Sequence, residues 1–98
     1  MMAGGTRIDK WLWHARFFRS RLQAQEAAAS GLLRLNGLRV EKASAGVQPG
    51  DVVTLPRSRD VLAVRIEAVA LRRGSAADAR KLYTIVAERL LDPSAPPS

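Results

Sequence analysis

Hydrophobic residues recur at helical spacing in the first part of the chain. At 100° per residue, one stripe contains Ile8, Trp11, Leu12, Ala15 and Phe18. Such a stripe is typical of a helix that buries one side against a core. We therefore predict a helix over residues 7–18, with Thr6 as its N-cap and Asp9 in its first turn.

A second helix is predicted over residues 22–30. Ser20 is followed three places later by Gln23, which is the pattern of a capping box. Alanines dominate the segment that follows and favour a helix. Gly31 suits the left-handed position just after a helix end.

Two short alternating segments on either side of Asn36-Gly37 predict a hairpin. Residues 33–35 and 38–40 alternate apolar and polar side chains. A two-residue type I′ turn needs positive φ at both central positions, and Asn and Gly tolerate this conformation. We therefore expect a tight turn between two antiparallel strands.

Two further strands are predicted, over residues 52–55 and 61–71. The turn Pro49-Gly50-Asp51 leads into the first of them. The apolar residues that share one face of the second are Leu62, Val64 and Ile66. Their alternation slips near Ala68, as a β-bulge would cause.

The last part of the chain fits two readings. Ser75, with Asp78 three places on, predicts that a helix starts at Ala76. Beyond Ala79 the apolar spacing fits a continuing helix, but Tyr83-Thr84-Ile85-Val86 also fits a strand.

Together these elements predict an α+β fold. Two N-terminal helices pack on a small antiparallel sheet, and a short C-terminal helix follows. We expect residues 1–6 to be a flexible N-terminus and residues 7–91 to form one domain. Residues 92–98, rich in proline and serine, are expected to be disordered.

Charge narrows the functional classes. The formal net charge is +7, and residues 1–42 hold eight basic but only three acidic residues. This favours a polyanionic partner, with a solvated basic surface as the alternative. The chain has no cysteine, which excludes disulfides and thiolate chemistry. No apolar segment has the length of a membrane span, so we expect a soluble cytoplasmic protein without a cofactor.

Three residues lie opposite the apolar stripe of the first helix. They are Lys10, Trp13 and Phe17. Two rings beside a lysine suit stacking on unpaired bases. The alternative is that a later segment covers both rings, because large aromatic side chains are mostly buried.

The start of the second helix is the best phosphate site in the sequence. Unpaired backbone N–H groups lie at a helix N-terminus, and here Arg19 and Arg21 flank them. Ser20 is expected to cap the helix, and its hydroxyl can also donate to a phosphate oxygen.

The order of these motifs resembles the S4 RNA-binding domain. The resemblance covers roughly residues 7 to 55 and rests on Arg7-Ile8-Asp9-Lys10, Ser20-Arg21, Gly31, Asn36-Gly37 and Pro49-Gly50-Asp51. It implies an S4-type (alpha-L) fold and RNA binding. It places RNA contacts at Arg7, Lys10, Arg16, Arg19, Ser20, Arg21, Gln25 and Lys42.

Residues 9–13 and 15–17 resemble the heat-shock protein 15 family most closely. That resemblance implies a non-catalytic factor that binds ribosomal RNA of the large subunit, in particular a stalled 50S subunit carrying peptidyl-tRNA. The uncharged tail after Leu91 departs from the long basic extension of that family. In this respect the chain is similar to the compact S4 factor of Gram-positive ribosome quality control, which assists tail addition.

Other interpretations stay open. Some S4 domains belong to RNA-modification enzymes, so the chain is alternatively an RNA-targeting module of that kind. The two helices also suit a DNA-binding module, although the aromatic residues favour irregular RNA. Arg16 is alternatively a partner of Asp9. We expect His14 to face the surface or the RNA, and the free protein to be a monomer.

Overall fold

A short strand pair holds the start of the first helix. The computed structural model of the protein describes residues 6–57 and 60–90. β1 (Thr6–Arg7) pairs antiparallel with β4 (Gly46–Val47), and α1 (Ile8–His14) follows directly. Thr6 therefore belongs to a strand and Arg7 is the N-cap, without a side-chain capping bond. This corrects the expectation that Thr6 caps the helix.

α1 ends at His14, earlier than the apolar stripe predicted. Arg16 has a positive φ of 64°, and its N–H donates to the Trp13 carbonyl oxygen while that of Phe17 donates to Leu12. These two bonds are those of a Schellman motif, in which a left-handed residue ends the helix. The usual signal for this motif is glycine, and here an arginine occupies the position.

α2 (Arg21–Ala29) begins as predicted. The Ser20 hydroxyl accepts from the Gln23 backbone N–H at 3.1 Å, and the Gln23 side chain accepts from the Arg19 N–H at 3.2 Å. Ala24 and Ala28 are buried. Gly31 follows with a φ of 82°, and a Cβ there would collide with the Arg39 guanidinium. Glycine is therefore favoured at this position by its conformation, whereas the Arg39 guanidinium is the end of a flexible side chain and could move aside.

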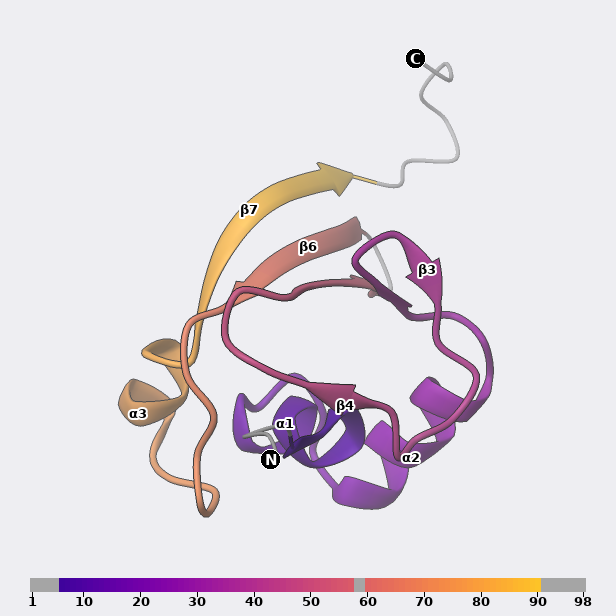
Figure 1. Cartoon of the computed structure of the whole chain (residues 1–98). Coiled ribbons are helices and arrows are strands. Elements are labelled where there is room, and N and C mark those ends of the chain that lie inside the picture. The colour runs from indigo at the N-terminus through magenta and orange to yellow at the C-terminus, as the bar shows by residue number, and fades with distance from the viewer. Residues whose placement is uncertain (1–5, 58–59, 91–98) are drawn as a thin grey trace.

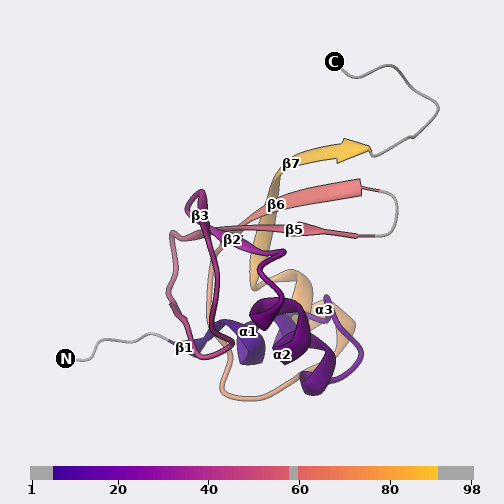
Figure 2. The ribbon, with the colours of Figure 1, turned by 90° about the vertical axis from the view of Figure 1, so that its right-hand side faces the viewer.

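The remaining strands form one antiparallel sheet. In spatial order they are β3 (Leu38–Arg39), β2 (Arg34–Leu35), β5 (Val52–Pro56), β6 (Asp60–Ile66) and β7 (Tyr83–Leu90). Figures 1 and 2 show α1 and α2 together on one side of this sheet. Asn36 and Gly37 have φ values of 52° and 84°, which confirms the predicted hairpin.

The two turn motifs of the sequence meet in space. The Asn36 Oδ1 accepts from the Val52 N–H at 2.8 Å, and its Nδ2 donates to Asp51 Oδ1 at 3.1 Å. The other Asp51 oxygen accepts from the Gln48 N–H. The Asn-Gly turn and the Pro-Gly-Asp turn therefore form one hydrogen-bonded unit at this end of the sheet.

β6 and β7 correct two details of the predicted strands. β6 ends at Ile66 rather than near Leu71. The register shifts between Ala63 and Val64, whose partners are Ala87 and Ile85, so the irregularity lies opposite β6 and not near Ala68. The buried face of β6 is as predicted and consists of Leu62, Val64 and Ile66.

The end of the described chain is a strand. α3 (Ala76–Arg80) starts with the predicted capping box between Ser75 and Asp78. β7 follows, so Tyr83-Thr84-Ile85-Val86 is strand and not helix. The α+β, S4-type fold is confirmed, with α3 placed before the last strand. The expectations for residues 1–5 and 92–98 lie outside the described residues.

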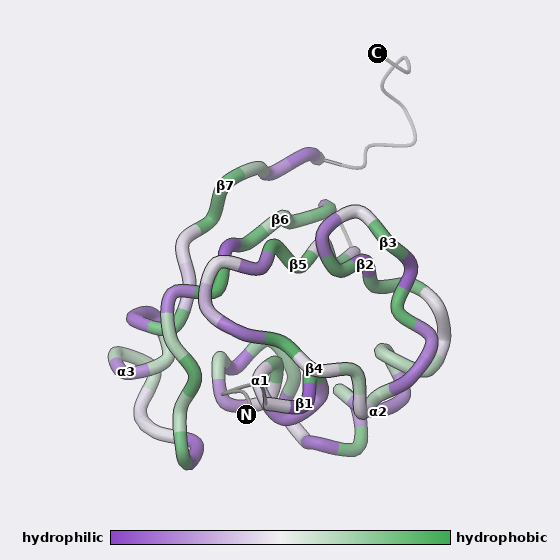
Figure 3. The backbone as a smooth tube through the Cα atoms, in the orientation of Figure 1, coloured by the Kyte–Doolittle hydropathy of each residue, from purple (hydrophilic) through white to green (hydrophobic). Residues whose placement is uncertain are grey.

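The core lies between the two N-terminal helices and the sheet. Its largest fully buried members are Trp11, Ile8, Leu12, Leu33 and Leu55. The Trp11 indole N–H donates to the Ala68 carbonyl oxygen at 3.0 Å, which satisfies the polar atom of the buried ring. Figure 3 shows hydrophobic stretches along β5 and β6, on the sheet that faces the helices.

Candidate nucleic-acid interface

A buried carboxylate at the start of α1 lies beside two arginines, one at the start of each N-terminal helix. The Asp9 side chain is fully buried, and Arg7 donates to both of its oxygens, at 3.1 and 3.0 Å. The Arg21 Nε lies 4.0 Å from Asp9 Oδ2. The Arg7 and Arg21 side chains remain 46% and 41% exposed, so both are accessible to a ligand. Asp9 therefore joins the starts of α1 and α2 through basic groups that face solvent.

Asp9 is ionised in the folded protein. Burial raises the pKa of its carboxyl, but the Arg7 side chain, the Lys10 backbone N–H and the charges of Arg7 and Arg21 outweigh burial and hold the pKa below its usual value. Opposite charge and hydrogen bonds to the charged form have this effect. Part of the positive charge of the two arginines is thereby compensated, and the rest is available to a phosphate.

The predicted phosphate site at α2 has the expected geometry. Ser20 is the N-cap, Arg19 is exposed, and Arg21 is the first residue of the helix. Gln25 lies half-buried one turn further along α2. The dipole and free N–H groups of a helix start attract anions. This helix start and the Asp9 pair lie next to each other because Arg21 belongs to both.

A loop brings Lys42 towards the same region. The N–H groups of Ile8 and Asp9 donate to the carbonyl oxygens of Ala45 and Ala43, at 2.8 and 3.4 Å. Lys42 is exposed at the start of this segment. The structure therefore groups Arg7, Lys10 and Arg21 with Arg19 and Ser20, and places Lys42 on a loop beside them. We call Arg7, Lys10, Arg19, Ser20 and Arg21 the S4 basic surface.

Arg16 lies apart from the S4 basic surface. Its guanidinium donates twice to the Gly74 carbonyl oxygen, at 3.1 and 2.7 Å, and not to Asp9. Arg73, which precedes Gly74 in the same loop, donates to the carbonyl oxygens of Trp13 and Phe18. The two arginines therefore link the end of α1 to the loop before α3. The proposed pairing of Arg16 with Asp9 is wrong.

The two aromatic residues are not open platforms. Trp13 and Phe17 are half-buried and pack against the core. The Arg73 guanidinium lies over the Trp13 ring at 5.4 Å from its centroid, and the Phe17 ring lies 4.7 Å from that of Tyr83. This corrects the outward-facing prediction, because segments more than fifty residues away in sequence cover both rings. Contact of either ring with RNA stays a prediction.

His14 is buried, which corrects the expectation of a surface position. Only 2% of its surface is exposed, and Nδ1 has no hydrogen-bond partner among the described residues. Burial lowers the pKa of its imidazole, and the charges of Lys10, Arg21 and Arg73 lower it further, against a hydrogen bond to the Ala70 backbone. His14 is therefore neutral near pH 7, and its imidazole is within reach of the charges of Lys10, Arg21 and Arg73.

Sequence reasoning missed Arg73 and the structural use of Asp9. Arg72-Arg73-Gly74 marks only a break between elements, and nothing local indicates that Arg73 reaches Trp13. The described residues hold no cluster of three or more His, Cys, Asp or Glu side chains suited to a metal ion. In the same part of the chain, no helix has the length and apolar character needed to cross a bilayer.

Comparisons with known proteins agree with this geometry. The S4 domain family matches residues 6–53. Heat shock protein 15 from Escherichia coli (strain K12) is 38% identical over 82 residues, which are 84% of this chain and 61% of that protein. Small ribosomal subunit protein uS4 from Maridesulfovibrio salexigens is 37% identical over 71 residues, covering 70% of this chain and 34% of that protein.

A solved structure gives the same result. The trimeric structure of heat shock protein 15 from Vibrio cholerae has a TM-score of 0.79 and 36% identity, and it covers 85% of this chain and 83% of that one. The chain spans 61% of the length of its Escherichia coli relative. With its S4 motifs, its fold and these similarities, the chain belongs to the heat shock protein 15 family and carries an S4 domain.

Proposed function

We propose that the protein is a ribosome-associated RNA-binding factor that binds RNA phosphates with its S4 basic surface and does not catalyse a reaction. The observation that carries this proposal is the buried Asp9 carboxylate, which hydrogen-bonds to Arg7 and lies 4.0 Å from the Nε of Arg21, the first residue of α2. Arginine donors in fixed positions suit phosphate oxygens.

The partner proposed is ribosomal RNA of the large subunit, in particular a stalled 50S subunit carrying peptidyl-tRNA. Membership of the heat shock protein 15 family and the excess of basic residues within residues 1–42 support this role. Assistance of tail addition is the alternative role on the same subunit. Co-sedimentation of the purified protein with 50S particles, with and without peptidyl-tRNA, tests the proposal. Equal recovery in both cases contradicts selectivity for the stalled particle.

Duplex DNA is a weaker candidate. A recognition helix reads bases with polar side chains along an exposed face. After Arg21, the exposed residues of α2 are Leu22, Gln23, Glu26 and Ala29, none of them basic. We therefore expect structured ribosomal RNA to displace duplex DNA from the protein. Preferential retention of DNA in a competition assay contradicts this expectation.

The salt dependence of RNA binding tests the site. Each phosphate contact removed lessens the slope of log K against log salt by about one. We expect Arg21→Ala to weaken RNA binding and lessen the slope by about one, whereas Arg65→Ala is expected to change it little. Arg65 is exposed on β6 and paired with Glu67, so it matches the charge change outside the S4 basic surface. Equal slopes for the two variants contradict the assignment, and circular dichroism checks that both fold.

The oligomeric state is a separate prediction. We expect the free protein to be a monomer, although its Vibrio cholerae relative is known from a trimeric structure. Light scattering of the purified chain with and without RNA measures the mass directly.

A further inference from the structure

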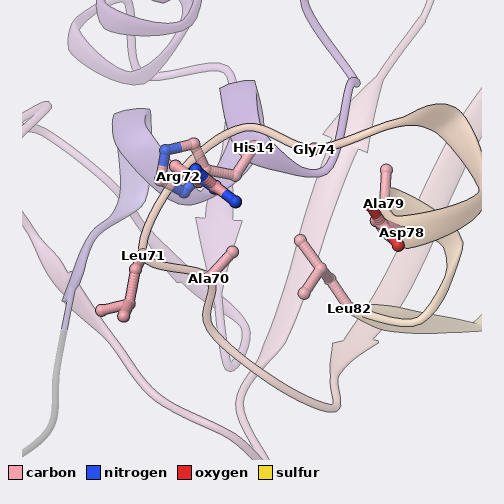
Figure 4. A pocket seen from close by; sticks show the side chains of 8 residues that line it. All are labelled: His14, Ala70, Leu71, Arg72, Gly74, Asp78, Ala79 and Leu82. Atoms are coloured by element: carbon pink, nitrogen blue, oxygen red, sulfur yellow. The ribbon is translucent and has the colours of Figure 1, made fainter.

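A cavity lies outside the S4 region, between α1 and the segment before β7. Its volume is about 300 Å³, and its walls come from His14 of α1, from residues 70–72 and 74 of the loop, and from residues 78, 79 and 82. Figure 4 shows the side chains of Ala70 and Leu82 pointing into the space between this loop and α3. The S4 family match ends at residue 53, so most of these walls lie beyond it.

The walls are apolar and the rim is charged. Ala70, Leu71, Ala79 and Leu82 supply methyl and methylene groups, and Ala79 and Leu82 are themselves buried. Leu71 is 97% exposed at the mouth, beside the exposed Arg72.

The cavity borders α1, the helix that also carries Lys10 of the S4 basic surface. His14 forms its inner wall, and the charges of Lys10 and Arg21 act on the imidazole of this residue. On the other side, Arg72 and Lys81 are close enough to Asp78 to stabilise its carboxylate. Exposed cationic groups therefore lie both in the S4 basic surface and near the cavity, at Arg72 and Lys81.

We propose that the cavity receives one unpaired nucleobase of the bound RNA, whose phosphate lies on Arg72. A base is flat and largely apolar on its faces, which suits the alanine and leucine walls. The volume is at the lower end of ligand cavities, as expected for a group of this size. The Asp78 carboxylate at the wall repels a phosphate, so the base enters and the phosphate stays at the rim. This inference rests on the RNA-binding function proposed above.

The test uses an RNA hairpin with one bulged 2-aminopurine, a base whose fluorescence reports its surroundings, and a matched hairpin without the bulge. We expect the emission to change when wild-type protein binds. Leu71→Ala and Arg72→Gln should each weaken binding of the bulged hairpin at least about fivefold and leave the unbulged hairpin unaffected. Both positions are exposed, so neither change should unfold the protein.

Arg80→Gln is the matched control. Arg80 is exposed on α3 and does not line the cavity. Its substitution removes one positive charge, as Arg72→Gln does. The inference is overturned if both cavity variants bind the bulged hairpin as tightly as the Arg80→Gln control does. It is also overturned if the emission is unchanged when wild-type protein saturates the bulged hairpin. If those results occur while Arg21→Ala still weakens RNA binding, only the base-binding cavity fails. Absence of RNA binding by the wild-type protein overturns the proposed function and the cavity together.

Discussion

Arg16 combines an unfavourable backbone with a favourable side chain. Its φ of 64° lies in the left-handed region, which costs a non-glycine residue about 1 kcal/mol or more. Its guanidinium donates two hydrogen bonds to the Gly74 carbonyl oxygen. The backbone conformation of Arg16 therefore lowers local stability, while its side chain links α1 to the loop that covers Trp13.

Two substitutions separate these contributions. Arg16→Ala and Arg16→Gly both remove the guanidinium, but only glycine adopts positive φ without strain. We expect Arg16→Gly to be more stable than Arg16→Ala by about 1 kcal/mol. Urea unfolding at neutral pH measures the difference. Equal stability of the two variants would mean that residue 16 leaves the left-handed conformation once the side chain is lost.

Single residues show which parts of the site a sequence reveals. The motif order predicted Arg7, Lys10 and Arg21 as contacts, and the structure places Arg7 and Arg21 beside the same carboxylate, that of Asp9. Asp9 lies in the same motif, but its complete burial depends on the loop around Ala43 and Ala45, which no local pattern predicts. Arg16 is unpredictable for a different reason, because helix ends of its kind are recognised by glycine.

Among the elements, the β2–β3 hairpin depends on one side chain. Asn36 adopts positive φ, accepts from the Val52 N–H and donates to Asp51. We expect Asn36→Ala to lower the free energy of unfolding by about 1–3 kcal/mol, because it loses these bonds and adds strain. Thermal unfolding measures the effect. Leu38→Ala, two residues away and 74% exposed, is the control and should change stability by less than about 0.5 kcal/mol. An equal loss of stability in both variants would show that the hairpin stabilises the fold only through its apolar surface.

Elements with a local chemical signal were predictable, and those fixed by distant partners were not. Ser20 and Ser75 each bond to a residue three places away, and Asn36-Gly37 connect two strands that pair directly across the turn, so their roles follow from spacing. β1 is only two residues long and exists because β4 lies beside it. The strand at Tyr83 fits both helical and strand periodicity, and its pairing with Ile66 at the end of β6 decides between them.

For the whole molecule, His14 links folding to pH. Burial lowers the pKa of its imidazole below the ordinary value of 6.5, so the unfolded chain binds the proton more tightly than the folded one. The stabilisation from neutral His14 is therefore complete above pH 6.5 and is lost as pH falls towards the lowered value. The slope is at most about 1.4 kcal/mol per pH unit for one proton.

Urea unfolding between pH 7.5 and 5 measures this slope. We expect the stability of the wild type to fall across this range, and His14→Gln, which does not titrate, to show a flatter curve whatever its absolute stability. Parallel curves would assign the slope to another group. The carboxyl of Asp9, whose pKa is lowered, acts in a separate window, because its contribution is lost only as pH falls below 3.8.

The Trp11 hydrogen bond to Ala68 has a practical consequence for anyone who wishes to graft this domain onto another protein. A fragment cut where the S4 domain match ends, at residue 53, would leave the indole N–H in the core without its acceptor and would remove most of β5 and all of β6. A grafted fragment that keeps this core must therefore extend at least through Ala68.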